Sequence, residues 1–75
     1  MDINKALAAF SALSQQPRLD VFRLLVKAGA DGLNAGEIAA LLDVKQNTMS
    51  ANLTVLLNAG MVRNERHGRT IRYFA

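Results

Sequence analysis

Residues 34–60 read NAGEIAALLDVKQNTMSANLTVLLNAG, and this stretch decides the fold. Asn34 stands at a helix-capping position, and Glu37 follows three residues later, as in a capping box. Apolar residues then recur at helical spacing until Asp43, and a second helical stripe fills residues 49–57. Two short helices separated by a tight turn predict a helix-turn-helix.

Two further helices are expected before this unit. Asp2 is a suitable cap for an amphipathic helix that ends near Leu13. Pro17 suits the first turn of a second helix, which Gly29 ends. Leu33 then lies in a short strand or an extended link. The apolar faces expected to form the core comprise Leu19, Phe22, Leu25 and Val26 in the second helix and Ile38, Leu41 and Leu42 in the third.

The hydrophobic period changes after Gly60 from helical to alternating, which predicts a β-hairpin, or wing, with its turn at His67-Gly68. A two-residue loop there places three pairs opposite one another: Val62 with Tyr73, Arg63 with Arg72, and Arg66 with Arg69. Like charges directly opposite destabilise a hairpin. A polyanion lying against the hairpin would explain them, and so would arginines that splay apart in water. A three-residue loop would change which arginines face outward.

The pattern as a whole predicts a mainly α fold with a small β-hairpin, in the order helix, helix, short strand, helix, helix, hairpin. The 75 residues are enough for one domain. We therefore expect a single winged helix-turn-helix over residues 1–75, with the helix-turn-helix at about 35–59 and the wing at about 61–74. A domain this short buries only about 60% of its unfolded surface, so it is marginally stable alone.

Charge is distributed unevenly along the chain. Residues 1–44 carry four basic and five acidic side chains, a net charge of −1, whereas residues 45–75 carry five basic side chains and one acidic side chain, a net charge of +4. A local excess of this kind attracts phosphate, although a solvated basic face would have the same composition.

The helix expected at residues 46–59 would be the one that enters a DNA major groove, where residues near its start meet base edges. Its outward face is polar and uncharged, whereas an ordinary solvated face is rich in Lys and Glu. Asn and Gln side chains pair with adenine, Ser and Thr bond to several bases, and Ala touches a thymine methyl group. We prefer the interpretation that this face reads bases to the alternative that it is only a helix end rich in capping residues. The candidate base-reading residues are Gln46, Asn47, Ser50, Ala51 and Thr54.

Phosphate contacts set the register of a DNA-binding protein and supply most of its salt-dependent affinity. The candidates in this sequence are basic or hydroxyl-bearing residues around the recognition helix and the wing: Lys45, Thr48, Arg63, Arg66, His67, Arg69 and Arg72. Arg18 is less specific, because an aspartate pairing or a backbone contact would explain it equally well. A lone histidine beside a turn glycine is more often a solvated turn residue than a ligand.

The sequence lacks the residues that several classes of function require. There is no cysteine, so there is no thiolate site, which fits a reducing cytoplasm. The single histidine has no carboxylate cluster to complete a metal site. No Ser-His-Asp arrangement and no glycine-rich phosphate loop occurs. We expect no enzymatic activity, no metal and no cofactor. The apolar N-terminal stretch lacks a positive region, so an unexported cytoplasmic chain is expected.

The sequence resembles the ArsR-type winged helix-turn-helix repressors. The matching segments keep their order and spacing along almost the whole chain: ALSQQPRL at 12–19, EIA at 37–39, QNTMS at 46–50, NAGMV at 58–62 and GR at 68–69, with Leu53, Leu56, Ile71 and Tyr73. The resemblance implies a homodimeric repressor that binds a palindromic double-stranded operator. It also implies base reading by Gln46, Asn47 and Ser50 and a wing at residues 61–74.

The sequence departs from the family pattern in four places. The family often has histidine where this chain has Ala51 and Asn52, and serine or proline where it has Lys45. The cysteine pair of its arsenic sensors would fall near residues 34–37 and is absent. Family members usually carry a further helix after the wing that builds much of the dimer interface. We therefore expect a chain that is truncated or lacks this helix, and a homodimer weakened accordingly.

Without that helix, dimerisation would depend on Ile3, Leu7 and Phe10 of the first helix. The sequence is thus interpreted as a sequence-specific transcriptional regulator, a repressor of the ArsR type. The alternative is a winged-helix protein–protein interaction module that does not bind DNA. Such modules lack the polar recognition face and the basic wing that are present in this chain.

Overall fold

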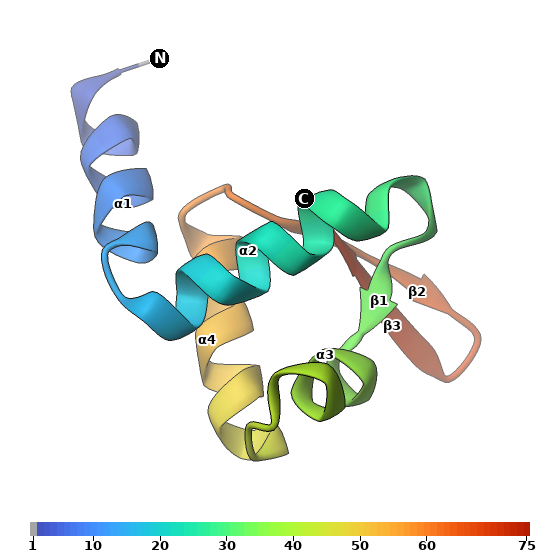
Figure 1. Ribbon diagram of the computed structural model, residues 1–75. Helices are drawn as coiled ribbons and strands as arrows, with labels where there is room; N and C mark the ends of the chain where they lie inside the picture. The colour runs from blue at the N-terminus through green and yellow to red at the C-terminus, as the bar shows by residue number, and fades with distance from the viewer. Residues whose placement is uncertain (1) are drawn as a thin grey trace.

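The computed structural model describes residues 2–75 and has the predicted element order (Figure 1). The elements are α1 (Ile3–Leu13), α2 (Gln16–Ala28), the short 3-10 helix η1 (Gly29–Asp31), β1 (Leu33–Asn34), α3 (Ala35–Leu42), α4 (Gln46–Asn58), β2 (Arg63–His67) and β3 (Thr70–Phe74). The predicted fold class, mainly helical with a small hairpin, is confirmed. The 3-10 turn η1 was not expected from the sequence.

Side chains cap two of the helices where the sequence predicts. The Asp2 carboxylate accepts a hydrogen bond from the Lys5 amide at 2.9 Å and starts α1. At α3, Asn34 Oδ1 accepts from the Glu37 amide at 2.8 Å, while Glu37 Oε1 accepts from the Asn34 amide at 3.0 Å. This reciprocal capping box satisfies two N–H groups that have no partner inside the helix.

Arg18 fixes the corner between α1 and α2. Its Nε donates to the Ala12 carbonyl at 2.6 Å, and its Nη2 donates to the Ser11 carbonyl at 3.3 Å. The last carbonyls of a helix have no partner inside it, so a guanidinium placed there satisfies them. Of the two roles that the sequence leaves open for Arg18, the structure therefore shows the backbone contact.

The core lies where α2, α3 and α4 meet under the sheet. Its fully buried side chains come from these three helices and comprise Val21, Leu25, Ile38, Met49, Leu53 and Leu56. α1 contributes Ala12, and the strand region contributes Val62 and Phe74. Truncation of a buried Leu, Ile or Met to Ala in such a core destabilises by about 2–5 kcal/mol.

Two residues that the helical pattern assigns to the core are exposed. Val26 is 57% exposed and Leu41 is 62% exposed. In α2 the buried arc is centred on Val21 and Leu25, which places Val26 roughly a third of a turn away. α3 is only eight residues long, and Ile38 and Ala39 hold its buried face. Leu41 falls on the margin of that face, so the expectation for both residues was wrong.

The sheet has three antiparallel strands in the order β1-β3-β2, so the last strand in the sequence lies in the middle. β1 pairs with β3 over two residues, Leu33 with Tyr73 and Asn34 with Arg72. Within the hairpin the two-residue loop is Gly68-Arg69 and not His67-Gly68, because His67 pairs with Thr70. Gly68 has a φ of 66°, and a glycine at the first loop position is typical of a type II′ turn.

The loop lies one residue later than the sequence predicts, so each pairing partner shifts by two residues. Glu65 lies opposite Arg72, and Arg66 lies opposite Ile71. The expected pairs of opposed arginines do not form, so their repulsion is no argument for a bound polyanion. Phe74, which pairs with Arg63 in the observed register, is only 5% exposed.

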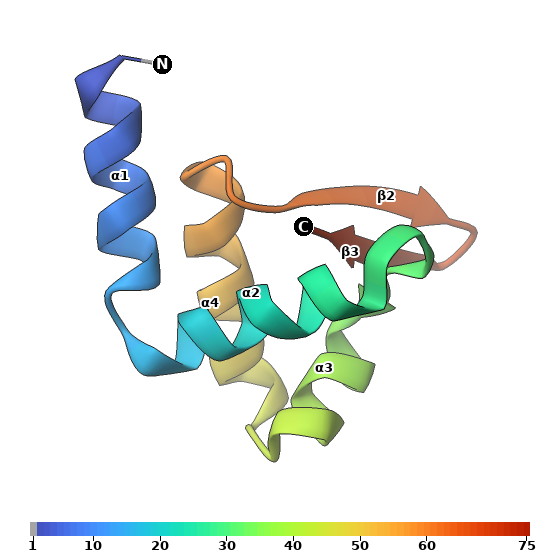
Figure 2. The same cartoon turned by 45° about the horizontal axis from the view of Figure 1, so that its top comes forward.

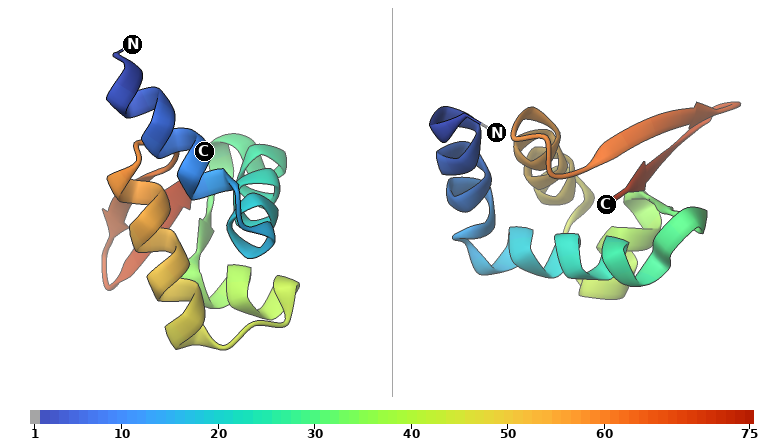
Figure 3. Two further views of the ribbon diagram at one scale, coloured as in Figure 1. Left: turned by 90° about the vertical axis from the view of Figure 1, so that its left-hand side faces the viewer. Right: turned by 90° about the horizontal axis from the view of Figure 1, so that it is seen from above.

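The first helix and the wing lie at opposite ends of the molecule (Figure 2). α1 packs beside α2 and α4, while the hairpin projects away from the helices, as the view from above shows (Figure 3).

Candidate nucleic-acid interface

The turn between α3 and α4 sets the direction of the second helix. Asp43 ends α3 in the left-handed conformation with φ 54° and ψ 49°, a conformation that Asp adopts more readily than most residues. The Val44 amide then donates to the Ala39 carbonyl at 3.0 Å, which closes the turn. α4 leaves this turn with Met49, Leu53 and Leu56 buried against the core. Its opposite face is consequently turned to solvent.

All five predicted base-reading residues lie on that exposed face: Gln46, Asn47, Ser50, Ala51 and Thr54. Two of them make local hydrogen bonds. Asn47 Oδ1 accepts from the Thr48 amide at 2.9 Å, and Thr54 Oγ1 donates to the Ser50 carbonyl at 3.0 Å. Within residues 2–75, the side-chain amide of Gln46 and the hydroxyl of Ser50 have no hydrogen-bond partner. The α4 face thus presents free donors and acceptors without any charge.

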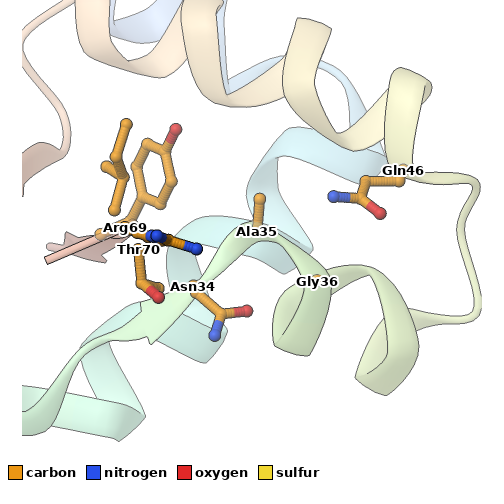
Figure 4. Close-up of a pocket in the computed structure, with 8 residues that line it drawn as sticks. Asn34, Ala35, Gly36, Gln46, Arg69 and Thr70 are labelled. Carbon is orange, nitrogen blue, oxygen red and sulfur yellow. The ribbon is translucent and has the colours of Figure 1, made fainter. Parts of the chain in front are cut away.

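A groove of about 350 Å³ separates the start of α4 from the wing (Figure 4). Gln46 stands at one end of the groove, Arg69 and Thr70 of the wing stand at the other, and Asn34 to Gly36 at the start of α3 lie between them. Ile71 and Tyr73 complete the lining. The start of α4 and the wing thus line one continuous groove.

The wing arginines, which the sequence groups together, divide into two kinds in the structure. Arg66 and Arg69 are exposed and have no hydrogen bond or ion pair with any residue in the range 2–75. Arg63 instead pairs with Glu65 at 2.6 Å, and its guanidinium lies over the Phe74 ring at 4.3 Å from the centroid. Arg72 donates to two backbone carbonyls. The candidates for phosphate contact thus differ in whether their guanidinium groups are already paired within the described residues.

The remaining phosphate candidates are also exposed. Lys45 precedes α4 at the N-cap position and makes no capping hydrogen bond, and Thr48 lies in the first turn. His67 lies at the distal end of β2, where its Nε2 is 3.2 Å from Glu65 Oε2. These residues surround the start of α4 and the tip of the hairpin, which are the two ends of the groove.

Glu65 is a feature that sequence reasoning did not single out. Residues at alternate positions of a strand share a face, so Arg63, Glu65 and His67 form a row along β2. Hydrogen bonds from His67 and Arg63 lower the pKa of the Glu65 carboxyl. An anion on a basic wing opposes the approach of phosphate. The signal was available in the sequence as the only acidic residue after residue 44.

The three residues predicted to form a dimer interface form one exposed apolar stripe on α1. Ile3 is 74% exposed, Leu7 is 59% exposed and Phe10 is 73% exposed. Their spacing of four and three residues keeps them on one face of the helix. The helix that carries this stripe, α1, lies at the end of the molecule opposite the wing (Figure 2).

Over residues 2–75 the structure brings together no group of three or more metal-ligating side chains. Within the same range, each helix is too short or too polar to span a membrane.

The sequence matches the family model described as a helix-turn-helix domain over residues 13–65. A comparison with the sequences of curated proteins found no match. Solved structures with the same fold include HlyU from Vibrio cholerae in its reduced form, 25% identical with a TM-score of 0.82, where the match covers 95% of this chain and 72% of that protein.

Two further structures match about equally well. The homodimeric winged helix-turn-helix DNA-binding domain of Mb0332 from Mycobacterium bovis, a possible ArsR-family transcriptional regulator, is 26% identical with a TM-score of 0.88. An ArsR-like transcriptional regulator from a Rhodococcus species is 29% identical with a TM-score of 0.84. The match covers 96% of this chain in both cases, but 64% and 65% of those chains. The chain thus belongs to the helix-turn-helix domain family, and its fold is similar to that of ArsR-type winged helix-turn-helix regulators.

Proposed function

We propose that this chain is the DNA-reading domain of a sequence-specific transcriptional repressor. One observation carries the proposal: the exposed, uncharged polar face of α4 adjoins a wing tip whose Arg66 and Arg69 have no partner among residues 2–75. A helix of this kind fits the major groove, where sequence is read by hydrogen bonds to base edges. Free arginines beside it supply the sequence-independent attraction to phosphate.

Gln46, Asn47, Ser50, Ala51 and Thr54 are the proposed base-reading residues. The side chains of Gln46 and Ser50 have no hydrogen-bond partner among residues 2–75, and Gln46 also lies at the edge of the groove. Asn47 would have to release the Thr48 amide before it could grip adenine with both its oxygen and its nitrogen. Ser50 and Thr54 follow one turn apart on the same face.

Lys45, Thr48, Arg66, His67 and Arg69 are the proposed phosphate or minor-groove contacts. Arg66 and Arg69 are the strongest of these, since neither has an ion pair among residues 2–75. Arg63 contributes less, because it already pairs with Glu65. In this arrangement α4 occupies the major groove, and the wing tip reaches the backbone or the adjacent minor groove.

The proposed protein works as a homodimer on a palindromic operator in the cytoplasm, without a cofactor and without catalysis. The homodimeric state of the similar Mb0332 domain supports this part of the proposal. The exposed stripe of Ile3, Leu7 and Phe10 on α1 is the proposed interface. A two-fold dimer requires two half-sites related by the same symmetry, and occupation of such a site at a promoter would repress transcription.

Selection from a pool of random duplex DNA at two salt concentrations tests the proposal. We expect retention of a two-fold symmetric site and weaker binding at higher salt. Recovery of half-sites alone would keep the reading domain and reject the dimeric operator. No retention at low salt would reject DNA binding, and a winged-helix module for protein–protein interaction would take its place.

The wing contribution is tested with the double variant Arg66→Ala/Arg69→Ala on the selected site. Loss of two phosphate contacts should reduce the slope of log affinity against log salt by about 1.8. Arg23→Ala on α2 is the matched control, because Arg23 is an exposed arginine outside the proposed interface. An unchanged slope in the double variant would remove the wing tip from the interface.

A further inference from the structure

Arg72 occupies a different environment from the other wing arginines. It lies on β3, the central strand, and its side chain is only 28% exposed. Its Nε donates to the Asp31 carbonyl at 2.9 Å and its Nη2 donates to the Gly32 carbonyl at 2.8 Å. Its Nη1 also lies 3.7 Å from Glu37 Oε1. The guanidinium is thus directed into the protein and not toward the groove.

These contacts join the wing to the helix-turn-helix. Asp31 and Gly32 belong to the link that enters β1, and Glu37 is the residue that completes the capping box of α3. The acceptors in the link lie 40 and 41 residues away from Arg72 in the sequence. The side chain therefore ties the middle of the hairpin to the segment from which α3 begins.

The backbone provides little of this connection by itself. β1 pairs with β3 over only two residues, and Asn34 with Arg72 is one of those pairs. Beyond this point the hairpin continues to the Gly68-Arg69 loop with pairing only between β2 and β3. Figure 2 shows this part extending away from the helices. A change of angle at the position of Arg72 would displace the whole tip.

We propose that Arg72 is a positioning residue for DNA recognition, which holds the wing at a fixed orientation to α4 and does not bind phosphate. The proposal rests on the function proposed above. It replaces the direct phosphate role that the sequence assigns to Arg72. The planar guanidinium satisfies two carbonyls and approaches a carboxylate simultaneously, whereas the single ammonium group of lysine cannot reproduce that fork. Charge alone is therefore insufficient at this position.

The first test uses the free protein and needs no DNA. NMR order parameters from residual dipolar couplings are compared for wild type, Arg72→Gln, Arg72→Lys and the control Arg23→Gln. In both Arg72 variants we expect the order parameters of the amides of residues 64–71 to fall from about 0.85 toward 0.6, while those of α3 and α4 stay high. Unchanged values in the hairpin would overturn the proposal.

Glu37→Gln provides a milder variant if the Arg72 variants fail to fold. Glutamine retains the capping interaction with Asn34 but removes the negative charge beside Nη1. We expect a smaller decrease in the order parameters of the same hairpin amides. A hairpin that stays as rigid as in wild type would count against the proposal.

The second test measures binding to the selected DNA site. Arg72→Gln and Arg72→Lys should both weaken binding by about tenfold, as loss of the wing contacts would. The Arg66→Ala/Arg69→Ala substitutions should then have a smaller effect in the Arg72→Gln background than in wild type. Wild-type affinity in Arg72→Lys, or additive effects, would overturn the positioning role.

The two proposals fail in distinguishable ways. A wild-type protein that binds no DNA would reject the proposed function and with it the recognition role of Arg72. A wild-type protein that binds, together with Arg72 variants that bind equally well, would reject the positioning role alone.

Discussion

At the residue scale, Gly32 is the position where the link before β1 passes closest to the central strand. It has a φ of 61° and a ψ of −175°, a backbone conformation that residues other than glycine rarely adopt. A Cβ atom placed there would lie 2.5 Å from the Phe74 ring and 2.6 Å from the Tyr73 carbonyl oxygen. The same residue provides the carbonyl that accepts from Arg72. Gly32 thus couples the link, the sheet and the core.

We therefore predict that Gly32→Ala lowers the free energy of unfolding by at least about 2 kcal/mol, because it combines backbone strain with a steric conflict. Urea denaturation measures the change. Gly36→Ala is the control, since a Cβ there would meet only Asn34 Oδ1 at 3.4 Å. The control should be neutral or slightly stabilising. Equal effects of the two substitutions would contradict the steric explanation.

A second prediction concerns Asn47 on the exposed face of α4. Asn47→Ala should reduce discrimination at one base pair of the operator by about 1–3 kcal/mol. The salt dependence of binding should remain, because no phosphate contact is removed. Competition binding with operators altered at single positions measures both quantities. Asn58→Ala, at the far end of the same helix, should leave both unchanged. Uniform weakening on all sequences would show that Asn47 contacts the backbone.

At this scale the sequence is informative about exposure and uninformative about distant partners. The helical period correctly predicts that Gln46, Ser50 and their neighbours face solvent, because Met49 and Leu53 must be buried. No local pattern indicates that Arg72 reaches carbonyls 40 residues away. The same residue type at Arg66, with no such acceptor nearby, keeps its charge free. Residue type alone did not separate these two environments.

At the element scale, the hairpin shows how a short strand pair escapes sequence reasoning. Its alternation and its glycine predict a two-residue loop, but they leave the position of that loop open by one residue and hence the pairing partners open by two. The preference of glycine for the first position of a type II′ turn favours the observed register. The helices were predicted more accurately, because caps at Asp2 and Asn34 define their starts. Only the margins of their buried faces, at Val26 and Leu41, were assigned wrongly.

The row of Arg63, Glu65 and His67 on β2 gives the wing a dependence on pH. The folded state lowers the pKa of Glu65 below its ordinary value of 4.5. The ionised carboxylate therefore stabilises the fold above that value, and its contribution disappears as the pH falls through the lowered pKa. We predict that wild type is more stable than Glu65→Gln at pH 7 and that the difference vanishes in acid. Urea denaturation at both pH values measures it, and a difference independent of pH would contradict the prediction.

The same carboxylate should oppose DNA binding, because it places a negative charge on the wing and occupies Arg63. We predict that Glu65→Gln binds the operator about threefold more tightly at moderate salt and that the gain decreases as salt screens the charge. Fluorescence anisotropy titrations at two salt concentrations test this. Weaker binding by the variant would indicate that Glu65 orders Arg63 for contact and does not oppose it.

At the scale of the whole molecule, the exposed stripe on α1 is large for a domain of 75 residues. We predict weak self-association through this face, because a small domain has limited core of its own and apolar surface favours burial. Sedimentation equilibrium at high micromolar concentration should show dimer for wild type and monomer for Leu7→Glu. Ala8→Glu, an exposed residue on another side of α1, should keep the dimer. A wild-type monomer at that concentration would contradict the prediction.

The position of β3 at the centre of the sheet has a consequence for how the protein is made. A ribosome produces β1 and β2 before it produces the strand that both of them pair with. A nascent chain that ends at residue 69 has its helix-turn-helix helices, but it lacks Arg72, Phe74 and every strand pairing of the sheet. Newly synthesised protein therefore gains its complete wing only when residues 70–74 have left the ribosome. We expect that the proposed DNA binding begins only after residues 70–74 are free to fold.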